Sequence, residues 1–223
     1  MRALYVFLQA VLGLAVIVGL WMAAAALWQE PSKLPPLAAT FNRALELATS
    51  EDYRAHASAS AYVLLWGLLP AIAVGIALGV VAGTSGVLRW LFGPLFITLG
   101  AAPLIALMPV LVLWLGLGPN VTTIAVFVIT VFPVANVVMA SLATRQASMP
   151  LAIVRGLRWG VVVGATALAI SEMLTARLGA ATFIMNAGSQ FQTIEVFAGI
   201  MLLFVPVIAV AAILQATEEQ LAA

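Results

Sequence analysis

The side chain with the clearest chemical potential in this sequence is a carboxyl group inside an apolar run. Glu172 stands in the segment Ala169-Ile170-Ser171-Glu172-Met173. A carboxylate within a membrane helix is costly and by default marks a solute pathway, a partner contact or a proton site. Placed about 16 residues into such a helix, it lies roughly 24 Å along the axis, close to the outer interface. Solvation there, or a pair with Arg177, is therefore an equally good interpretation.

A second polar feature is a line of hydroxyl groups in the apolar run 121–143. Thr123, Thr130 and Ser141 fall on one face of a helix over this run and could line a polar path. Bonding of such hydroxyls to the carbonyls of their own helix is the commoner role. Both interpretations stay open from the sequence.

Groups for catalysis or metal binding are scarce. His56 is the only histidine, which argues against a zinc site, and the lack of cysteine excludes a thiolate site and a cysteine nucleophile. The sequence has no G-x-x-x-x-G-K-[ST] phosphate loop, and its only lysine is Lys33. The net charge of +1 gives no field for nucleic acid. We therefore expect no enzyme and no cofactor, and any ATP hydrolysis would come from another chain.

The elements that must position these residues are membrane helices. Of 223 residues, 65% are hydrophobic and 8% are charged, whereas soluble domains carry about 25% charged residues. A helix needs roughly 20 apolar residues to cross the hydrocarbon core, and long apolar runs favour helices over barrels. We expect an all-α integral membrane fold with a single domain over residues 1–223. Its six spans are expected at about 6–28, 58–84, 91–115, 121–143, 156–176 and 196–216.

Turn formers and prolines indicate where these runs break. The segment 116–120, Gly-Leu-Gly-Pro-Asn, divides an uncharged stretch that is far too long for one span. Pro94, Pro103 and Pro109 fall in the third span, and each removes a helical hydrogen bond. The third span is therefore expected to be discontinuous.

Charge placement predicts the orientation. Six spans put both termini on one side, and cytoplasmic segments are richer in arginine and lysine. With the N-terminus inside, short cytoplasmic segments hold Arg2, Arg89, Arg145, Arg155 and Arg158. The outer loop 29–57 is then expected to carry a short amphipathic helix, either as a solvated connection or as a docking surface.

Two spans carry ladders of glycines spaced by four residues. They are Gly75, Gly79 and Gly83 in the second span and Gly156, Gly160 and Gly164 in the fifth. Each ladder lies on one helix face, where missing side chains let another backbone approach closely. Both helices are expected inside a packed bundle, either in static packing or with faces that slide.

The order of several short motifs resembles the permease subunits of type I ATP-binding-cassette (ABC) importers, in the nitrate, sulfonate and taurine branch. The similarity runs from about Val18 to Ile213. The motifs are Pro36-Leu37 to Phe41, Gly75 to Gly83, Ala106 to Gly116, Phe132-Pro133 with Asn136, Ser171 to Leu174, and Ile184 to Ala187 followed by Gln192-Thr193.

The resemblance implies a chain in the bacterial inner (plasma) membrane, with both termini cytoplasmic. It implies a second permease subunit, two cytoplasmic ATPases and, usually, an external binding protein that delivers a small anion or sulfonate. It also adds Asn136 and Asn186 to Thr130 and Glu172 as hypothetical residues of the substrate pathway.

One departure from the family pattern affects coupling to the ATPase. The family carries an E-A-A-x-x-x-G pattern on a coupling helix between the fourth and fifth of these spans. Here only nine residues separate Arg145 from Arg155, and Met149-Pro150 resembles the tail of the family's loop. Such a link cannot hold a helix lying across an ATPase and also return to the membrane.

Two functions of different classes follow. The first is a permease subunit of a heteromeric ABC-type importer, paired with a second permease that keeps its coupling helix. The alternative is a permease-derived structural subunit of a larger membrane complex, with no transport activity.

Overall fold

The structure is a computed structural model that describes residues 2–144 and 147–222, with side chains described from residue 12 onward except residue 14. Within these ranges the chain forms helices and no strand, which confirms the predicted all-α class. The helices are α1 (Arg2–Trp28), α2 (Leu37–Thr49), α3 (Glu51–Val63), the π-helical η1 (Leu64–Leu68), α4 (Leu69–Thr84), α5 (Gly86–Ala101), the 3-10 turn η2 (Leu104–Leu107), α6 (Met108–Leu115), α7 (Pro119–Ala143), α8 (Met149–Thr175), α9 (Ala180–Ser189) and α10 (Thr193–Leu221).

Four helical stretches of the described chain are long and apolar enough to cross a membrane. They are Glu51–Thr84, Pro119–Ala143, Met149–Thr175 and Thr193–Leu221. A fifth crossing arises if the bent pair of Gly86–Ala101 and Leu104–Leu115 is one span. The remaining predicted span, the first (6–28), corresponds to α1, whose described apolar part, Ala15–Trp28, is shorter than a crossing. The count of six spans stays a prediction.

The predicted break in the third span is present, at the start of the segment that holds Pro103. The two halves of this span meet at an angle of 80°. Ala102 has an extended backbone, with φ −68° and ψ 142°. Because proline disfavours helical geometry in the residue before it, the helix ends there.

The helix that carries the predicted second span begins earlier than expected, at Glu51 inside the predicted outer loop. Ser50 caps it, since its hydroxyl accepts a hydrogen bond from the Tyr53 N–H at 3.3 Å. Glu51 and Asp52 lie in the first turn, where negative charge is favourable. The same helix widens to a π-turn before Pro70, where the Leu69 N–H bonds to the Leu64 carbonyl.

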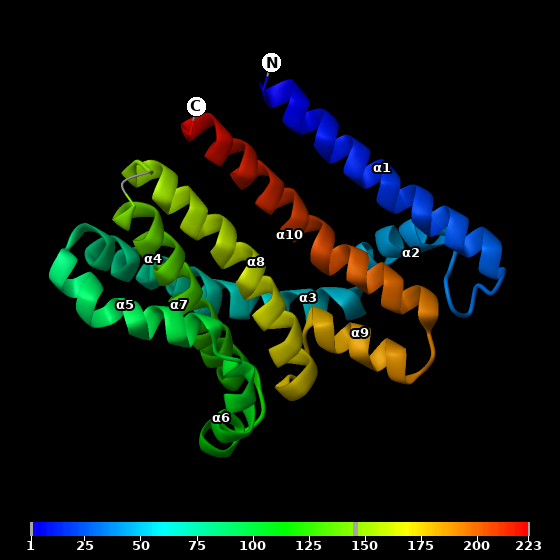
Figure 1. Cartoon of the computed structure of the whole chain (residues 1–223). Helices are drawn as coiled ribbons and strands as arrows, with labels where there is room; N and C mark the ends of the chain where they lie inside the picture. Colours follow the sequence, from blue (N-terminus) through cyan, green and yellow to red (C-terminus); the bar gives the residue numbers. More distant parts are fainter. Residues whose placement is uncertain (1, 145–146, 223) are drawn as a thin grey trace.

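Helices α4, α7 and α8 form the centre of the molecule and meet through the glycines of the two ladders (Figure 1). A Cβ on Gly79 would lie 2.6 Å from the Val138 Cβ and 2.7 Å from the Ala135 carbonyl oxygen. A Cβ on Gly160 would lie 2.5 Å from Ile72. The backbones are therefore closer together than any larger residue at these positions would allow.

Helix α1 lies at the edge of the bundle and is held near its C-terminal end. The Trp21 indole N–H donates to the Pro35 carbonyl at 3.0 Å, and its ring meets the edge of Phe197 at 5.0 Å. The start of α1 and the end of α10 lie at one end of the molecule, together with the end of α7 and the start of α8 (Figure 1). Helix α6 lies at the opposite end.

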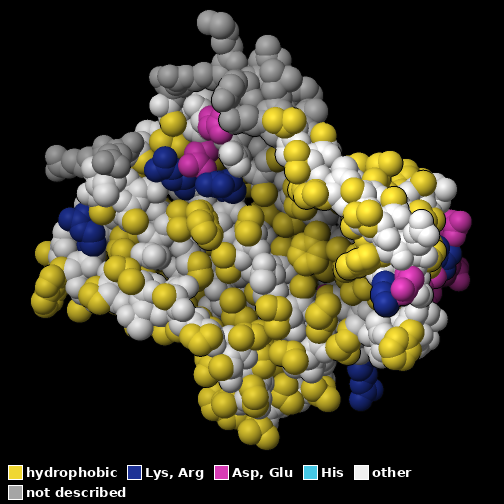
Figure 2. All heavy atoms as spheres, turned by 45° about the vertical axis from the view of Figure 1, so that its right-hand side comes forward, with side chains coloured by type: hydrophobic (Ala, Val, Ile, Leu, Met, Phe, Trp, Pro, Cys, Tyr) yellow, Lys and Arg dark blue, Asp and Glu magenta, His cyan; other side chains and the backbone are white. Residues whose placement is uncertain are grey.

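The surface agrees with a membrane location. Figure 2 shows a face covered largely by hydrophobic side chains, with charged groups gathered above it and along one side. Exposed large side chains include Trp90, Leu113 and Trp114, which are 80%, 83% and 78% exposed. Such a surface is stable against lipid or another membrane protein and not against water.

Candidate functional site

The carboxyl group of Glu172 is fully enclosed near the end of α8. The residue is 1% exposed. The Ser60 hydroxyl donates to Oε1 at 2.6 Å, and the Ala181 N–H donates to Oε2 at 2.9 Å. Arg177 is exposed, and the polar partners of the carboxylate come from α3 and α9. The alternative of a solvated carboxylate, or of a pair with Arg177, is therefore wrong.

His56 belongs to the same buried region and contacts the backbone. Its Nδ1 lies 2.8 Å from the Gly179 carbonyl oxygen and 3.1 Å from the Gly179 nitrogen, so one of these two groups is its partner, according to the tautomer. Its ring meets Phe183 edge-on at 5.6 Å. Residues 2–144 and 147–222 contain no group of three metal-ligating side chains around it or elsewhere.

The other predicted pathway residues lie apart from Glu172. Thr130 is 0% exposed, and within the described structure its hydroxyl has no hydrogen-bond partner. Asn136 is half-buried on α7, and Asn186 is exposed on α9. Among the described side chains, no hydrogen bond joins any of these three to Glu172. Thr123, on the same face of α7 as Thr130, bonds to the Pro119 carbonyl of its own helix at 2.7 Å.

Sequence reasoning missed Ser60 and Gly179, which complete the surroundings of Glu172. Ser60 lies 112 residues before Glu172, so no local pattern relates the two. One sequence signal was present. The residues that open α9, Leu178-Gly179-Ala180-Ala181, contain no capping side chain, which indicates that another element supplies one.

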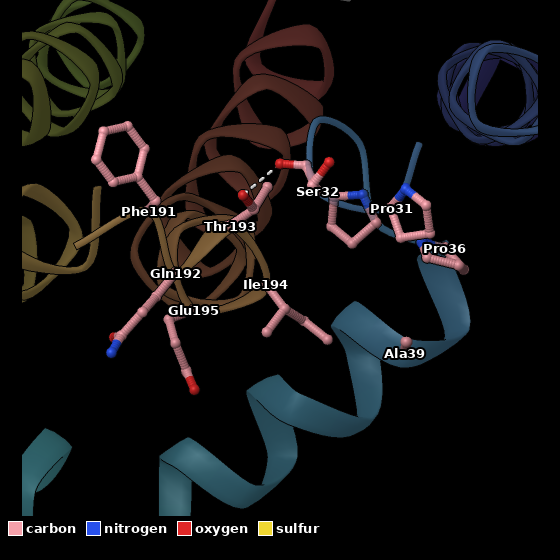
Figure 3. Close-up of a pocket in the computed structure, with 10 residues that line it drawn as sticks. Pro31, Ser32, Pro36, Ala39, Phe191, Gln192, Thr193, Ile194 and Glu195 are labelled. Atoms are coloured by element: carbon pink, nitrogen blue, oxygen red, sulfur yellow. Dashed lines mark hydrogen bonds between the residues drawn. The ribbon is translucent and has the colours of Figure 1, made fainter. Parts of the chain in front are cut away.

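A pocket of about 590 Å³ opens between the segment before α2 and the turn that joins α9 to α10 (Figure 3). The Thr193 hydroxyl closes it on one side by donating to the Ser32 carbonyl at 2.6 Å. Phe191, in the turn, has a left-handed φ of 57° and is 91% exposed. The lining residues are Pro31, Ser32, Pro35, Pro36, Ala39, Phe191, Gln192, Thr193, Ile194 and Glu195.

An ion pair joins the two walls of this pocket. The Arg43 Nε on α2 donates to Glu195 Oε1 and Oε2 on α10 at 2.8 and 3.0 Å, and a further nitrogen reaches Glu46 at 2.6 Å. The hydrogen bond to Glu46, together with those to Glu195, raises the pKa of Arg43 above its usual value against the opposing effect of burial. Arg43 therefore stays charged at any physiological pH.

A double-mutant cycle of Arg43→Ala and Glu195→Gln is expected to give a coupling free energy of about 1 kcal/mol, because the pair is partly exposed and screened by solvent. Thermal unfolding of the purified chain in detergent measures it. The cycle of Lys33 with Glu30, whose side chains are 66% and 53% exposed, serves as the control and is expected to give less. Equal couplings in the two cycles would contradict the prediction.

The connection between α7 and α8 is shorter than the sequence predicted. Helix α7 ends at Ala143 and α8 begins at Met149, which leaves residues 144–148 between them. Met149, Pro150 and Arg155, predicted to lie in the link, belong to α8. The helix starts early because the Ser148 hydroxyl accepts from the Leu151 N–H at 3.5 Å and proline suits the first turn. Arg145 lies outside the described residues.

Helix α8 is tied to α10 at this end by two arginines that share one carboxylate. Arg155 Nε lies 2.8 Å from Glu218 Oε1, and Arg158 Nε lies 2.9 Å from Oε2. The contact between Arg158 and Glu218 is an ion pair whose geometry does not meet that of a hydrogen bond. We call this group the Glu218 clamp. The Glu218 clamp joins the first turns of α8 to the C-terminal part of α10.

Comparison with known proteins gives a related transport protein. No family model matches the chain. The chain is 26% identical over 216 positions to the taurine transport system permease protein TauC of Escherichia coli (strain K12), covering 84% of this chain and 78% of that protein. This similarity supports an ABC importer permease, a membrane transport subunit that is not an enzyme. With the apolar helices, it identifies a multi-pass membrane protein.

Proposed function

We propose that this chain is a transmembrane permease subunit of a heteromeric ABC-type importer for a small anion or a sulfonate-like solute. The observation that carries the proposal is the similarity to the taurine permease over 84% of the chain. The chain is one transmembrane domain of six spans in the bacterial inner membrane. The start of α1 and the end of α10 lie at the same end of the molecule, which supports an even number of crossings (Figure 1). The arginines predicted in the short segments at this end favour a cytoplasmic location for both termini.

The chain pairs with a second permease that carries the coupling helix. One observation supports this part of the proposal: the link between α7 and α8 is limited to residues 144–148. A permease without a rigid element that grips the ATPase cannot receive its closing motion directly.

The ATPase subunits therefore act on this chain chiefly through the second permease, and an external binding protein delivers the solute. The pocket beside Phe191 and Thr193 lies at the far end of α10 from the C-terminus, on the side where such a protein would dock. The polar residues Thr130, Asn136, Glu172 and Asn186 are proposed to contribute to the solute pathway.

A pull-down in mild detergent tests the proposal. An affinity tag on this chain is expected to recover a second permease and an ATPase, and deletion of the chain is expected to abolish uptake of the solute. An unrelated multi-pass protein with the same tag is the control. Recovery of a stable homodimer alone would contradict the proposal. A deletion that disturbs a larger complex and leaves uptake unchanged would favour the alternative, a structural subunit.

The substitution Thr130→Val tests the pathway role of Thr130. If the hydroxyl faced only protein, its removal by a residue of the same shape would stabilise the chain by about 1 kcal/mol, because a buried hydroxyl without a partner is unfavourable. If it contacts the solute, as proposed, the apparent KM of uptake rises several-fold.

Thr182→Val is the matched control for this substitution. Thr182 is also buried, but its hydroxyl donates to the Glu172 carbonyl at 3.1 Å, so its removal is expected to destabilise the chain. Thermal unfolding in detergent and uptake kinetics in cells measure the two effects. An unchanged KM in Thr130→Val would remove Thr130 from the proposed pathway.

A further inference from the structure

We propose that Glu172 is a positioning residue that caps α9 from outside that helix and thereby holds the turn between α9 and α10. The geometry that carries this inference is the meeting of three elements at one carboxylate. Glu172 belongs to α8, Ser60 to α3, and the Ala181 N–H to the first turn of α9. This role goes beyond the proposed transport function and does not depend on which solute is carried.

Helix α9 needs such a cap because its own sequence provides none. The first N–H groups of a helix have no partner within it, and a side chain at the N-cap position usually accepts from one of them. The N-cap of α9 is Gly179, which has no side chain. The Ala180 N–H donates to the Ser60 hydroxyl at 2.8 Å, and the Ala181 N–H donates to Glu172. Two free amides of α9 are thus satisfied by residues of other helices.

Ser60 connects the two capping contacts in one chain of hydrogen bonds. Its hydroxyl accepts from the Ala180 N–H and donates to Glu172 Oε1 at 2.6 Å. Each oxygen of the carboxylate therefore accepts from a group of the protein. A negative charge at this place is also favoured by the partial positive charge at the start of α9. The carboxylate thus accepts one hydrogen bond from α3 and one from the start of α9, and the second of these caps α9.

The packing around Gly179 shows how closely the carboxyl group fits against this turn. A Cβ on Gly179 would lie 2.4 Å from the carboxyl carbon of Glu172 and 2.5 Å from Oε2. Gly179 has an extended backbone, with φ 164° and ψ 152°, that other residues also adopt. Glycine is required here for space, because any side chain would displace the carboxylate from the helix start.

The cap is linked to the outer pocket through α9 itself. The inner face of α9 packs on α10, where a Cβ on Gly199 would lie 2.8 Å from Ile184. After α9 ends at Ser189, the chain turns through Phe191 and enters α10 at Thr193, and this turn lines one wall of the pocket (Figure 3). Loss of the cap would free the start of α9 and, with it, the wall formed by the turn.

Hydrogen exchange of the purified full-length chain, with any partners that co-purify, tests the inference. In Glu172→Ala the amides of residues 180–184 are expected to exchange at least about 10-fold faster, while those of residues 121–140 in α7 keep their rates. Ser60→Ala is expected to show a smaller acceleration at the same amides. Glu172→Gln is expected to be intermediate, because the amide oxygen can still accept one hydrogen bond. Glu219→Gln, at an exposed position on α10, is the control and is expected to change nothing.

A cysteine probe provides a second measurement that does not depend on Glu172→Ala folding well. The chain contains no cysteine, so a single introduced thiol is labelled selectively. Ala187 on α9 is 3% exposed, and Ala187→Cys is expected to react several-fold faster in the Ser60→Ala or Glu172→Gln background. Ala125→Cys, at a position of 0% exposure on α7, reports global unfolding and is expected to stay unreactive.

Unchanged exchange at residues 180–184 and unchanged labelling of the cysteine at 187 in these backgrounds would overturn the inference. Equal acceleration at α7 would also overturn it, because the effect would then be a general loss of stability. A change in solute uptake kinetics alone, with both probes unchanged, would also overturn the capping role and would leave Glu172 with only the proposed role in the solute pathway.

Discussion

Replacement of Gly79 by leucine is expected to give the largest loss of stability of any substitution described here. A Cβ at this position would already lie 2.6 Å from the Val138 Cβ and 2.7 Å from a backbone carbonyl oxygen of α7. Neither atom is the end of a flexible side chain, so α4 and α7 must separate to admit a leucine. Overpacking usually costs about 1–3 kcal/mol, and this contact with backbone places Gly79→Leu at or above about 3 kcal/mol.

Thermal unfolding in detergent, followed by size-exclusion chromatography, measures this loss. A decrease in Tm of at least about 6 °C is expected, and a large part of the protein is expected to aggregate. Gly19→Leu is the matched control. Gly19 also lies within a helix, but nothing outside that helix comes within 4 Å of a Cβ there, so a leucine is expected to be accommodated. Equal stability of the two variants would show that α4 and α7 are not in close contact.

Reversal of charge at Glu218 is expected to release the end of α10 from α8. In Glu218→Lys, Arg155 and Arg158 lose their shared carboxylate and face a third positive charge. The side chains are partly exposed, at 31% for each arginine and 16% for Glu218, so solvent screens the interaction. We therefore expect a destabilisation of about 1–2 kcal/mol, below the range for a fully buried pair.

Glu219→Lys provides the control for the Glu218 clamp, because Glu219 is exposed and its contact is a 3.4 Å hydrogen bond to Gln215. Combining Arg155→Glu with Glu218→Lys restores one ion pair in reverse and is expected to recover part of the lost stability. Limited proteolysis of the C-terminal turns of α10, together with thermal unfolding, follows the release. Equal effects of Glu218→Lys and Glu219→Lys would show that the clamp contributes nothing.

The apolar helices could be predicted from the sequence because their cause is local. A run such as 121–143 is apolar enough to leave water, and its helical form follows from the need to pair every backbone group inside lipid. The sequence signals for the ends of several helices were also local, since Pro103 breaks the third span and Pro119 opens α7 after a glycine turn. The helix of the outer loop also followed from its amphipathic pattern, although its bounds did not.

Helix starts that depend on a capping side chain were placed with less accuracy. The hydroxyls of Ser50 and Ser148 start α3 and α8 earlier than the apolar pattern suggested, because a cap stabilises a first turn that is polar and lies outside the apolar run. A span defined by hydropathy is thus a lower bound on the length of its helix. For α8, this difference moved Met149, Pro150 and Arg155 from the predicted link into the helix.

The sequence by itself determined that this chain is helical, belongs in a membrane and has a short link before Met149, because composition and local spacing carry that information. Only the tertiary structure decided what Glu172 does, since its partners lie on α3 and α9 and one of them is 112 residues away. It likewise decided which arginines meet Glu218. A side chain's solvation and hydrogen bonds depend on which helices pack against it, and that packing is a property of the whole bundle.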